Sequence, residues 1–165
     1  MTWTPNRRMA TVAAVIFFLD QFTKFLVLYF LATDQETVIV DGFFKFVRWG
    51  NTGAAWSLLH DNNLLLAVIS ILALTGLVLW RDYFDTKTLW GQIALGLIFG
   101  GIVGNLLDRL HPMRHQVIDF LRFYMYQRNG QEIGFPAFNV ADSAICIGVT
   151  ILILISWIQD RAADA

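Results

Sequence analysis

The sequence predicts an all-α membrane protein with four transmembrane helices and a small β-hairpin outside the membrane. Apolar residues make up 56% of the 165 residues and charged residues 15%, whereas a soluble domain has roughly 45–50% and about 25%. The mean hydropathy is +0.55. Apolar segments alternate with polar stretches along the whole chain. The length predicts a single domain that spans residues 1–165.

Four apolar segments have the length of membrane helices, since a bilayer core of about 30 Å needs roughly 20 residues. They cover residues 10–31, 64–80, 90–107 and 141–158. Arg7 and Arg8 before the first segment also resemble the start of a cleaved signal peptide. However, Asp20 and Lys24 interrupt that segment and no clear cleavage site follows. We therefore expect the segment to remain as a helix.

The distribution of Lys and Arg predicts the orientation, because these residues favour the cytoplasmic side. Four helices place both termini on one side, where five basic residues lie in short segments: Arg7, Arg8, Arg81, Lys87 and Arg161. Six lie in the two long loops on the other side: Lys45, Arg48, Arg109, Arg114, Arg122 and Arg128. The higher density at the termini predicts that both termini are cytoplasmic and that the long loops face outward.

The composition excludes several function classes. A net charge of −1 provides no basic surface for nucleic acid. The single cysteine, Cys146, excludes an intramolecular disulfide and a cysteine metal cluster. The three histidines, His60, His111 and His115, lie in loops and form no metal-binding motif. We expect neither a metal nor another cofactor.

Charged residues inside the first helix indicate a polar site within the bundle. Asp20 and Lys24 are four residues apart and share a helix face. Each costs about 2.5–3.5 kcal/mol at the bilayer centre. The two residues form either an ion pair that only lowers this cost or a polar face directed at a site.

The ends of the third and fourth helices offer similar alternatives. The third helix contains Gly96, Gly100 and Gly104, each four residues apart, and Gly101, and small residues at this spacing allow a close helix contact. Asn105 and Arg109 then share one face, either at a helix end that enters water or at a site. Asn139 is a good N-cap and places Asp142 in the first turn, which is a complete structural explanation of that acid.

The two outer loops add a hairpin and a second unusual acid. Asp41 and Gly42 between two β-prone runs predict a hairpin. Asp119 lies in the second long loop with apolar neighbours on both sides, which is unusual for an exposed acid. With the topology above, Asp119 and Asp142 both fall in the outer half. Two neighbouring carboxyl groups share a proton, so one can activate water while the other polarises a carbonyl.

Five motifs in order resemble the bacterial lipoprotein signal peptidases, the signal peptidase II family of aspartyl intramembrane peptidases. They cover residues 20–24, 51–57, 100–109, 117–120 and 135–143. The resemblance implies a bacterial plasma-membrane endopeptidase with its site toward the outer leaflet and a β-cradle outside the membrane. Its substrate would be a prolipoprotein, cleaved before a diacylglyceryl-modified cysteine, and globomycin-type peptides would inhibit it.

The matching positions imply roles for ten residues. Asp119 and Asp142 correspond to the catalytic dyad. The residues that would bind substrate or support the site are Asp20, Lys24, Asn51, Gly104, Asn105, Arg109, Asn139 and Ala141. The chain departs from the family at Trp56, where Phe is common, and in residues 111–116, which lack a glycine often found there. Residues 124–133 have no assigned role.

Two other functions were considered for the same residues. Asp20, Lys24 and Asp142 at membrane depth also suit a proton-coupled transporter or channel, although the halves show no internal repeat. The glycine spacing also suits a structural assembly subunit, which would leave the apolar setting of Asp119 unexplained. The expected partners are the prolipoprotein and membrane lipid, and the chain is expected to be a monomer.

Overall fold

The computed structural model describes residues 4–53, 59 and 61–163 and contains four α-helices. Helix α1 spans Pro5–Phe30, α2 Asn63–Leu79, α3 Leu89–Leu110 and α4 Val140–Ala163, and a short 3-10 helix, η2, spans Arg81–Tyr83. Helix α1 begins five residues before the predicted residue 10, because the Thr4 side chain caps it and Pro5 occupies its first turn. Residues 54–57 of the second motif and His60 lie outside the described residues.

Three of these helices are long and apolar enough to cross a membrane: Pro5–Phe30, Leu89–Leu110 and Val140–Ala162. Helix α2 is apolar but has only 17 residues. Large apolar side chains are exposed along the outer faces of the helices, among them Phe18, Leu72 and Ile153. Such faces suit contact with lipid, since lipid does not penalise apolar exposure.

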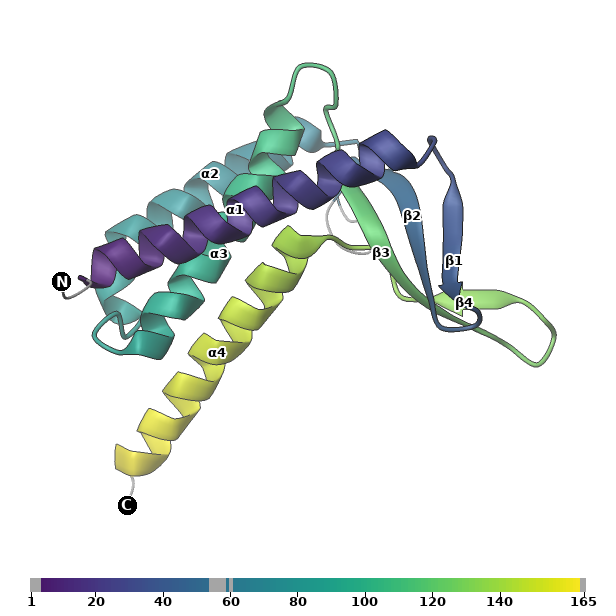
Figure 1. Cartoon of the computed structure of the whole chain (residues 1–165). Helices are drawn as coiled ribbons and strands as arrows, with labels where there is room; N and C mark the ends of the chain where they lie inside the picture. Colours follow the sequence, from purple (N-terminus) through teal and green to yellow (C-terminus); the bar gives the residue numbers. More distant parts are fainter. Residues whose placement is uncertain (1–3, 54–58, 60, 164–165) are drawn as a thin grey trace.

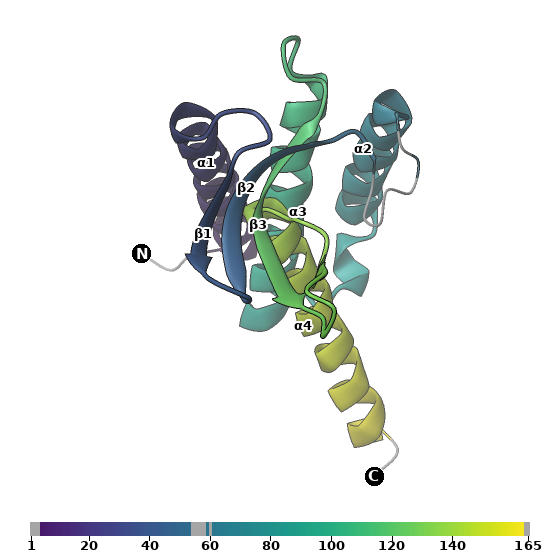
Figure 2. The same cartoon turned by 90° about the vertical axis from the view of Figure 1, so that its right-hand side faces the viewer.

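Helix α3 is the centre of the bundle and packs against each of the other helices. Figure 2 shows α1 and α2 on opposite sides of α3. A Cβ atom at Gly100 would lie 2.6 Å from the Ala13 carbonyl oxygen of α1, and one at Gly101 would lie 2.5 Å from the Ala141 carbonyl oxygen of α4. The prediction that these glycines allow close helix packing is confirmed.

A four-stranded antiparallel sheet lies at one end of the bundle, and both chain termini lie at the other end (Figure 1). Its strands are β1 (Glu36–Val40), β2 (Phe44–Asn51), β3 (Val117–Tyr126) and β4 (Glu132–Gly134), in that order. The predicted hairpin is present as β1 and β2. Its turn contains Gly42 at φ +69°, in the left-handed region that glycine adopts without strain.

The sheet is larger than the predicted hairpin, because the second long loop also forms strands. Strand β3 pairs along β2, and Asp119 lies opposite Trp49. Val27 of α1 packs with Ile118 and Phe120 of β3 in one buried cluster. This contact fixes β3, and with it Asp119, against the end of the bundle.

We expect Gly100→Val to destabilise the folded protein by about 1–3 kcal/mol. The added side chain would meet the backbone of α1, which cannot move aside as a flexible side chain can. Thermal unfolding in detergent measures the effect. Val103→Leu is the control on the same helix, because Val103 is 37% exposed. Equal stability of the two variants would contradict the close contact.

Candidate functional site

Asp119 is a buried carboxyl group held at the bundle end of strand β3. Its side chain is 3% exposed. Asn51, the last residue of β2, donates from Nδ2 to Asp119 Oδ2 at 2.9 Å. Asn139 donates from Nδ2 to Asp119 Oδ1 at 2.8 Å. The strand pairing and two amide donors therefore fix the orientation of this carboxyl group.

Asp142 lies in the first turn of α4 and forms a reciprocal cap with Asn139. The Asp142 backbone N–H donates to Asn139 Oδ1 at 2.9 Å, and the Asn139 backbone N–H donates to Asp142 Oδ2 at 3.1 Å. Asn105 of α3 also donates from Nδ2 to Asp142 Oδ1 at 2.7 Å. The capping role anticipated from the sequence is thus present, together with a contact from a second helix.

Asn139 joins the two carboxyl groups. Its buried side chain, 0% exposed, accepts from the Asp142 backbone and donates to Asp119. Burial, and then the nearby charge of Asp142, raise the pKa of Asp119 from the usual 3.8 to about 7. One proton is therefore held at Asp119 near neutral pH.

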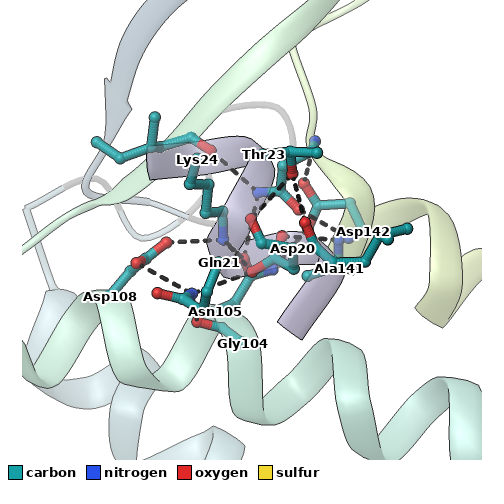
Figure 3. A network of polar contacts seen from close by, with 12 residues as sticks. Asp20, Gln21, Thr23, Lys24, Gly104, Asn105, Asp108, Ala141 and Asp142 are labelled. Carbon is teal, nitrogen blue, oxygen red and sulfur yellow. Dashed lines mark hydrogen bonds and ion pairs between the residues drawn. The ribbon is translucent and has the colours of Figure 1, made fainter. Parts of the chain in front are cut away.

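A buried ion network of α1 and α3 lies beside Asp142 (Figure 3). Lys24 Nζ lies 2.8 Å from Asp20 Oδ2, and both side chains are 0% exposed. Lys24 also donates to Asn105 Oδ1 at 2.9 Å. The ion pair is therefore present, and its lysine also contacts Asn105, which is hydrogen-bonded to Asp142, as the alternative of a polar face directed at a site expects.

Ala141 and Gly104 contribute backbone and space. The Ala141 backbone N–H donates to Asp20 Oδ1 at 3.0 Å, which attaches the start of α4 to α1. A Cβ atom at Gly104 would lie 2.6 Å from Asp20 Oδ2. Glycine at position 104 is therefore what allows the Asp20 carboxylate to approach α3.

Arg109 and a cavity complete the arrangement. Arg109 Nη2 donates to the Gly53 carbonyl oxygen at 2.9 Å. The cavity has a volume of about 830 Å³, and its lining includes Asp119, Asp142, Arg109, Asn51 and Asn105. Its apolar walls come from α2, α3 and α4 and include Leu66, Ile69, Ile102 and Ile145. The two carboxyl groups thus line a cavity whose walls are mostly apolar.

The structure therefore brings all ten sequence-predicted residues into one region. Sequence reasoning noted Asp108 beside Asn105 and Arg109, and Gln21 within the first motif, but predicted no role for them or for Arg114. All three contact this network. The sequence did contain a signal for Asp108. Lys24 has only one acidic residue within its own helix, so a second acidic partner would have to come from another helix. Within the described ranges, no three His, Cys, Asp or Glu side chains are grouped to hold a metal ion.

The fold and the site define a membrane protein with several apolar helices and two carboxyl groups, one buried and one half-buried, beside a cavity. The chain belongs to the family described as Signal peptidase (SPase) II, which matches residues 12–158. It is accordingly a peptidase of bacterial membranes.

Individual relatives agree with this assignment. A lipoprotein signal peptidase of Anoxybacillus flavithermus is 33% identical over 162 residues, which are 98% of this chain and 92% of that protein. A lipoprotein signal peptidase of Symbiobacterium thermophilum is 36% identical over 157 residues, 95% of this chain and 97% of that protein.

Solved structures are similar as well. A bacterial membrane enzyme determined in meso at 2.3 Å resolution has a TM-score of 0.80 and 29% identity, covering 95% of this chain and 91% of that one. A second, determined at 1.9 Å, has a TM-score of 0.75 and 30% identity, covering 92% and 93%.

The raised pKa of Asp119 predicts a pH-dependent cost to stability. Between pH 3.8 and about 7 the unfolded chain has lost this proton while the folded protein keeps it. The contribution of Asp119 to stability therefore falls as pH rises through this window and is constant above it. Asp119→Asn replaces one accepting oxygen with an NH2 group and so loses a hydrogen bond at every pH. Because the variant lacks the ionisation cost, we expect its Tm relative to the wild type to rise by several °C between pH 4 and pH 8.

Thermal unfolding of the wild type and the variant across this pH range tests the expectation. Asp160→Asn, at an exposed position near the end of α4, is the control and should follow the wild type at every pH. A constant difference between Asp119→Asn and the wild type would contradict the elevated pKa.

Proposed function

We propose that this protein removes signal peptides from diacylglyceryl-modified prolipoproteins by cleaving the peptide bond before the lipidated cysteine. Asp119 and Asp142 are the catalytic dyad. One observation carries the proposal: a buried carboxyl group, Asp119, and a half-buried one, Asp142, come from different elements, are joined through Asn139 and line one cavity. The family assignment and the two lipoprotein signal peptidases similar to the chain support the substrate class.

The two carboxyl groups have different roles in this mechanism. Asp142 is the base, because the N-terminus of α4 and donors from Asn105 and Asn139 stabilise its ionised form. Asp119 keeps the proton, because burial and the charge of Asp142 raise its pKa to about 7. Attack by water with acid assistance requires one ionised and one protonated carboxyl group, which Asp142 and Asp119 provide in this mechanism.

The reaction then proceeds in two balanced steps. Asp142 takes a proton from water as its oxygen attacks the scissile carbonyl, and Asp119 donates its proton to the carbonyl oxygen. In the second step, Asp142 returns its proton to the leaving nitrogen and the C–N bond breaks. Asp119 recovers its proton from the hydroxyl group of the intermediate, which restores the original state of the dyad.

The surrounding residues position these groups. Asn51 and Asn139 orient Asp119, while Asn105 orients Asp142. Arg109 lines the cavity and donates to the Gly53 carbonyl oxygen, so it holds Gly53, another lining residue, in place. The supporting roles of Asp20, Lys24, Gly104 and Ala141 follow from their contacts with α4 and Asn105.

The apolar walls of the cavity suit the substrate. Leu66 and Ile69 of α2 and Ile145 of α4 are among the apolar residues that line the cavity. A signal peptide is an apolar segment and the modified cysteine carries two acyl chains, so both gain from apolar contact. A globomycin-type inhibitor would occupy the same cavity.

All four helices cross the bacterial plasma membrane in this proposal, and the single domain acts as a monomer. Helix α2, with 17 residues, would span about 26 Å at 1.5 Å per residue, a mismatch that local thinning of the bilayer can accommodate. Both termini lie away from the sheet (Figure 1), which agrees with cytoplasmic termini and with a sheet and dyad toward the outer leaflet.

We expect purified protein to cleave a diacylglyceryl-modified prolipoprotein but not the unmodified form. Asp119→Asn and Asp142→Asn should each lower turnover by at least about a thousandfold, because each removes a proton-transfer group. A gel-shift assay of the product, run in detergent with excess chelator, measures both effects.

Asp160→Asn is the matched carboxylate control and should retain full turnover, since it lies at the far end of α4. Absence of cleavage by folded wild type would overturn the peptidase proposal. Proton flux in liposomes would then test the transporter alternative.

The mechanism also predicts how the rate depends on pH. Because Asp119 must carry a proton, kcat/KM should fall as pH rises through about 7, the pKa of this group. Initial rates between pH 5 and 9 on the lipidated substrate measure the profile. A rate that increases through this range would instead require Asp119 to act in its ionised form.

A further inference from the structure

A cluster of four charged side chains lies behind the dyad. Lys24 Nζ lies 2.8 Å from Asp20 Oδ2 and 2.7 Å from Asp108 Oδ2. Arg114 Nη1 lies 2.6 Å from Asp108 Oδ1. The side chains of Asp20, Lys24 and Asp108 are 0% exposed, and that of Arg114 is 22% exposed. Asp108 therefore joins α1, α3 and the connector from α3 to β3.

The formal charges of this cluster cancel only when Arg114 is included. Asp20 and Asp108 contribute two negative charges, and Lys24 contributes one positive charge. The buried part alone is therefore negative, and burial of an unbalanced charge costs several kcal/mol in general. Arg114 supplies the second positive charge from residues 111–116, the stretch in which the sequence departs from its family.

Lys24 transmits this arrangement to the dyad through Asn105 (Figure 3). The Lys24 ammonium group donates to Asn105 Oδ1 and lies within ion-pair distance of Asp20 Oδ2 and Asp108 Oδ2. Asn105 Oδ1 also accepts from Asn139 Nδ2 at 3.2 Å. With its oxygen held on that side, the Asn105 amide must direct Nδ2 toward Asp142 Oδ1, at 2.7 Å.

We propose that Asp108 and Arg114 are positioning residues for the reaction and form one unit. Asp108 holds the Lys24 ammonium against Asn105, and Arg114 balances the charge of Asp108 while anchoring the connector. That connector leads into β3, which begins at Val117 and carries Asp119. The unit therefore acts on both carboxyl groups: on Asp142 through Lys24 and Asn105, and on Asp119 through the start of its strand.

The inference rests on the proposed function, and charge substitutions provide its test. The charged groups around Asp119 are Asp142 of α4, Lys24 of α1 and Arg109 of α3. His111 and His115 lie on the connector with Arg114. These groups remain the same in every variant, so only the balance of the unit changes.

The variants should shift the titration of Asp119 in opposite directions. Arg114→Gln leaves excess negative charge and should move the midpoint upward by roughly 0.5 pH unit, whereas Asp108→Asn should move it downward by about as much. The double variant Asp108→Asn/Arg114→Gln restores the balance and should return the midpoint close to that of the wild type. Arg114→Lys preserves the charge and should leave the midpoint unchanged.

Two readouts separate this inference from the proposed function. The infrared carboxyl band of Asp119, taken as the difference between each protein and its Asp119→Asn counterpart, gives the midpoint without turnover. The pH profile of kcat/KM on the lipidated substrate should show the same shifts, and kcat should fall roughly tenfold in each single variant with KM little changed. Arg128→Gln, at an exposed arginine after β3, should change neither quantity.

Each result decides one of the two proposals. Opposite shifts of the Asp119 midpoint that cancel in the double variant support the positioning unit, whether or not the wild type cleaves the substrate. Failure of the wild type to cleave would overturn the proposed function alone. Shifts in the same direction, or none in any variant, would overturn the inference and leave Asp108 and Arg114 with a structural role. If Asp108→Asn does not fold, the comparison of Arg114→Gln with Arg114→Lys tests the inference instead. The Asp119 midpoint should move upward in Arg114→Gln and stay unchanged in Arg114→Lys.

Discussion

The buried ammonium group of Lys24 is the interaction on which the rest of the structure depends. It contacts Asp20 in its own helix and Asp108 and Asn105 in α3. A lysine in an apolar helix is costly unless every donor hydrogen is satisfied. This requirement brings α1 and α3 together at one depth, and Gly104 is the residue that lets the Asp20 carboxylate approach.

The start of α4 follows from the same network. Asp20 accepts from the Ala141 backbone, and Asn139 and Asp142 cap each other. The contacts that begin the helix are also the contacts that orient both carboxyl groups. Stability and chemistry are opposed at Asp119, because its burial raises the cost of ionisation while keeping a proton available.

The sheet gives the site its second half. Helices alone could present Asp142, but Asp119 and Asn51 are held by the pairing of β2 with β3. The packing of Ile118 and Phe120 on Val27 fixes this sheet to the bundle. An irregular loop in the same place would leave the distance between the two acids undetermined.

The sequence by itself determined the local features of this protein. Apolar length predicted the helices, the Asp41-Gly42 turn predicted the hairpin, and Asn139 with Asp142 predicted a cap. Each is set by neighbouring residues, within reach of a periodicity or turn preference. The ordered motifs also indicated which residues belong to the candidate site, although not which contacts they make with one another.

Only the tertiary structure decided the contacts between distant segments. The sequence alone predicts a loop for the apolar run around Asp119, and pairing with β2 makes this run part of strand β3. The contacts of Lys24 with Asp108, and of Asp108 with Arg114, depend on how helices and the connector meet. Local sequence patterns do not specify these contacts, because the contacts arise from the packing of distant elements and from the need to neutralise buried charge.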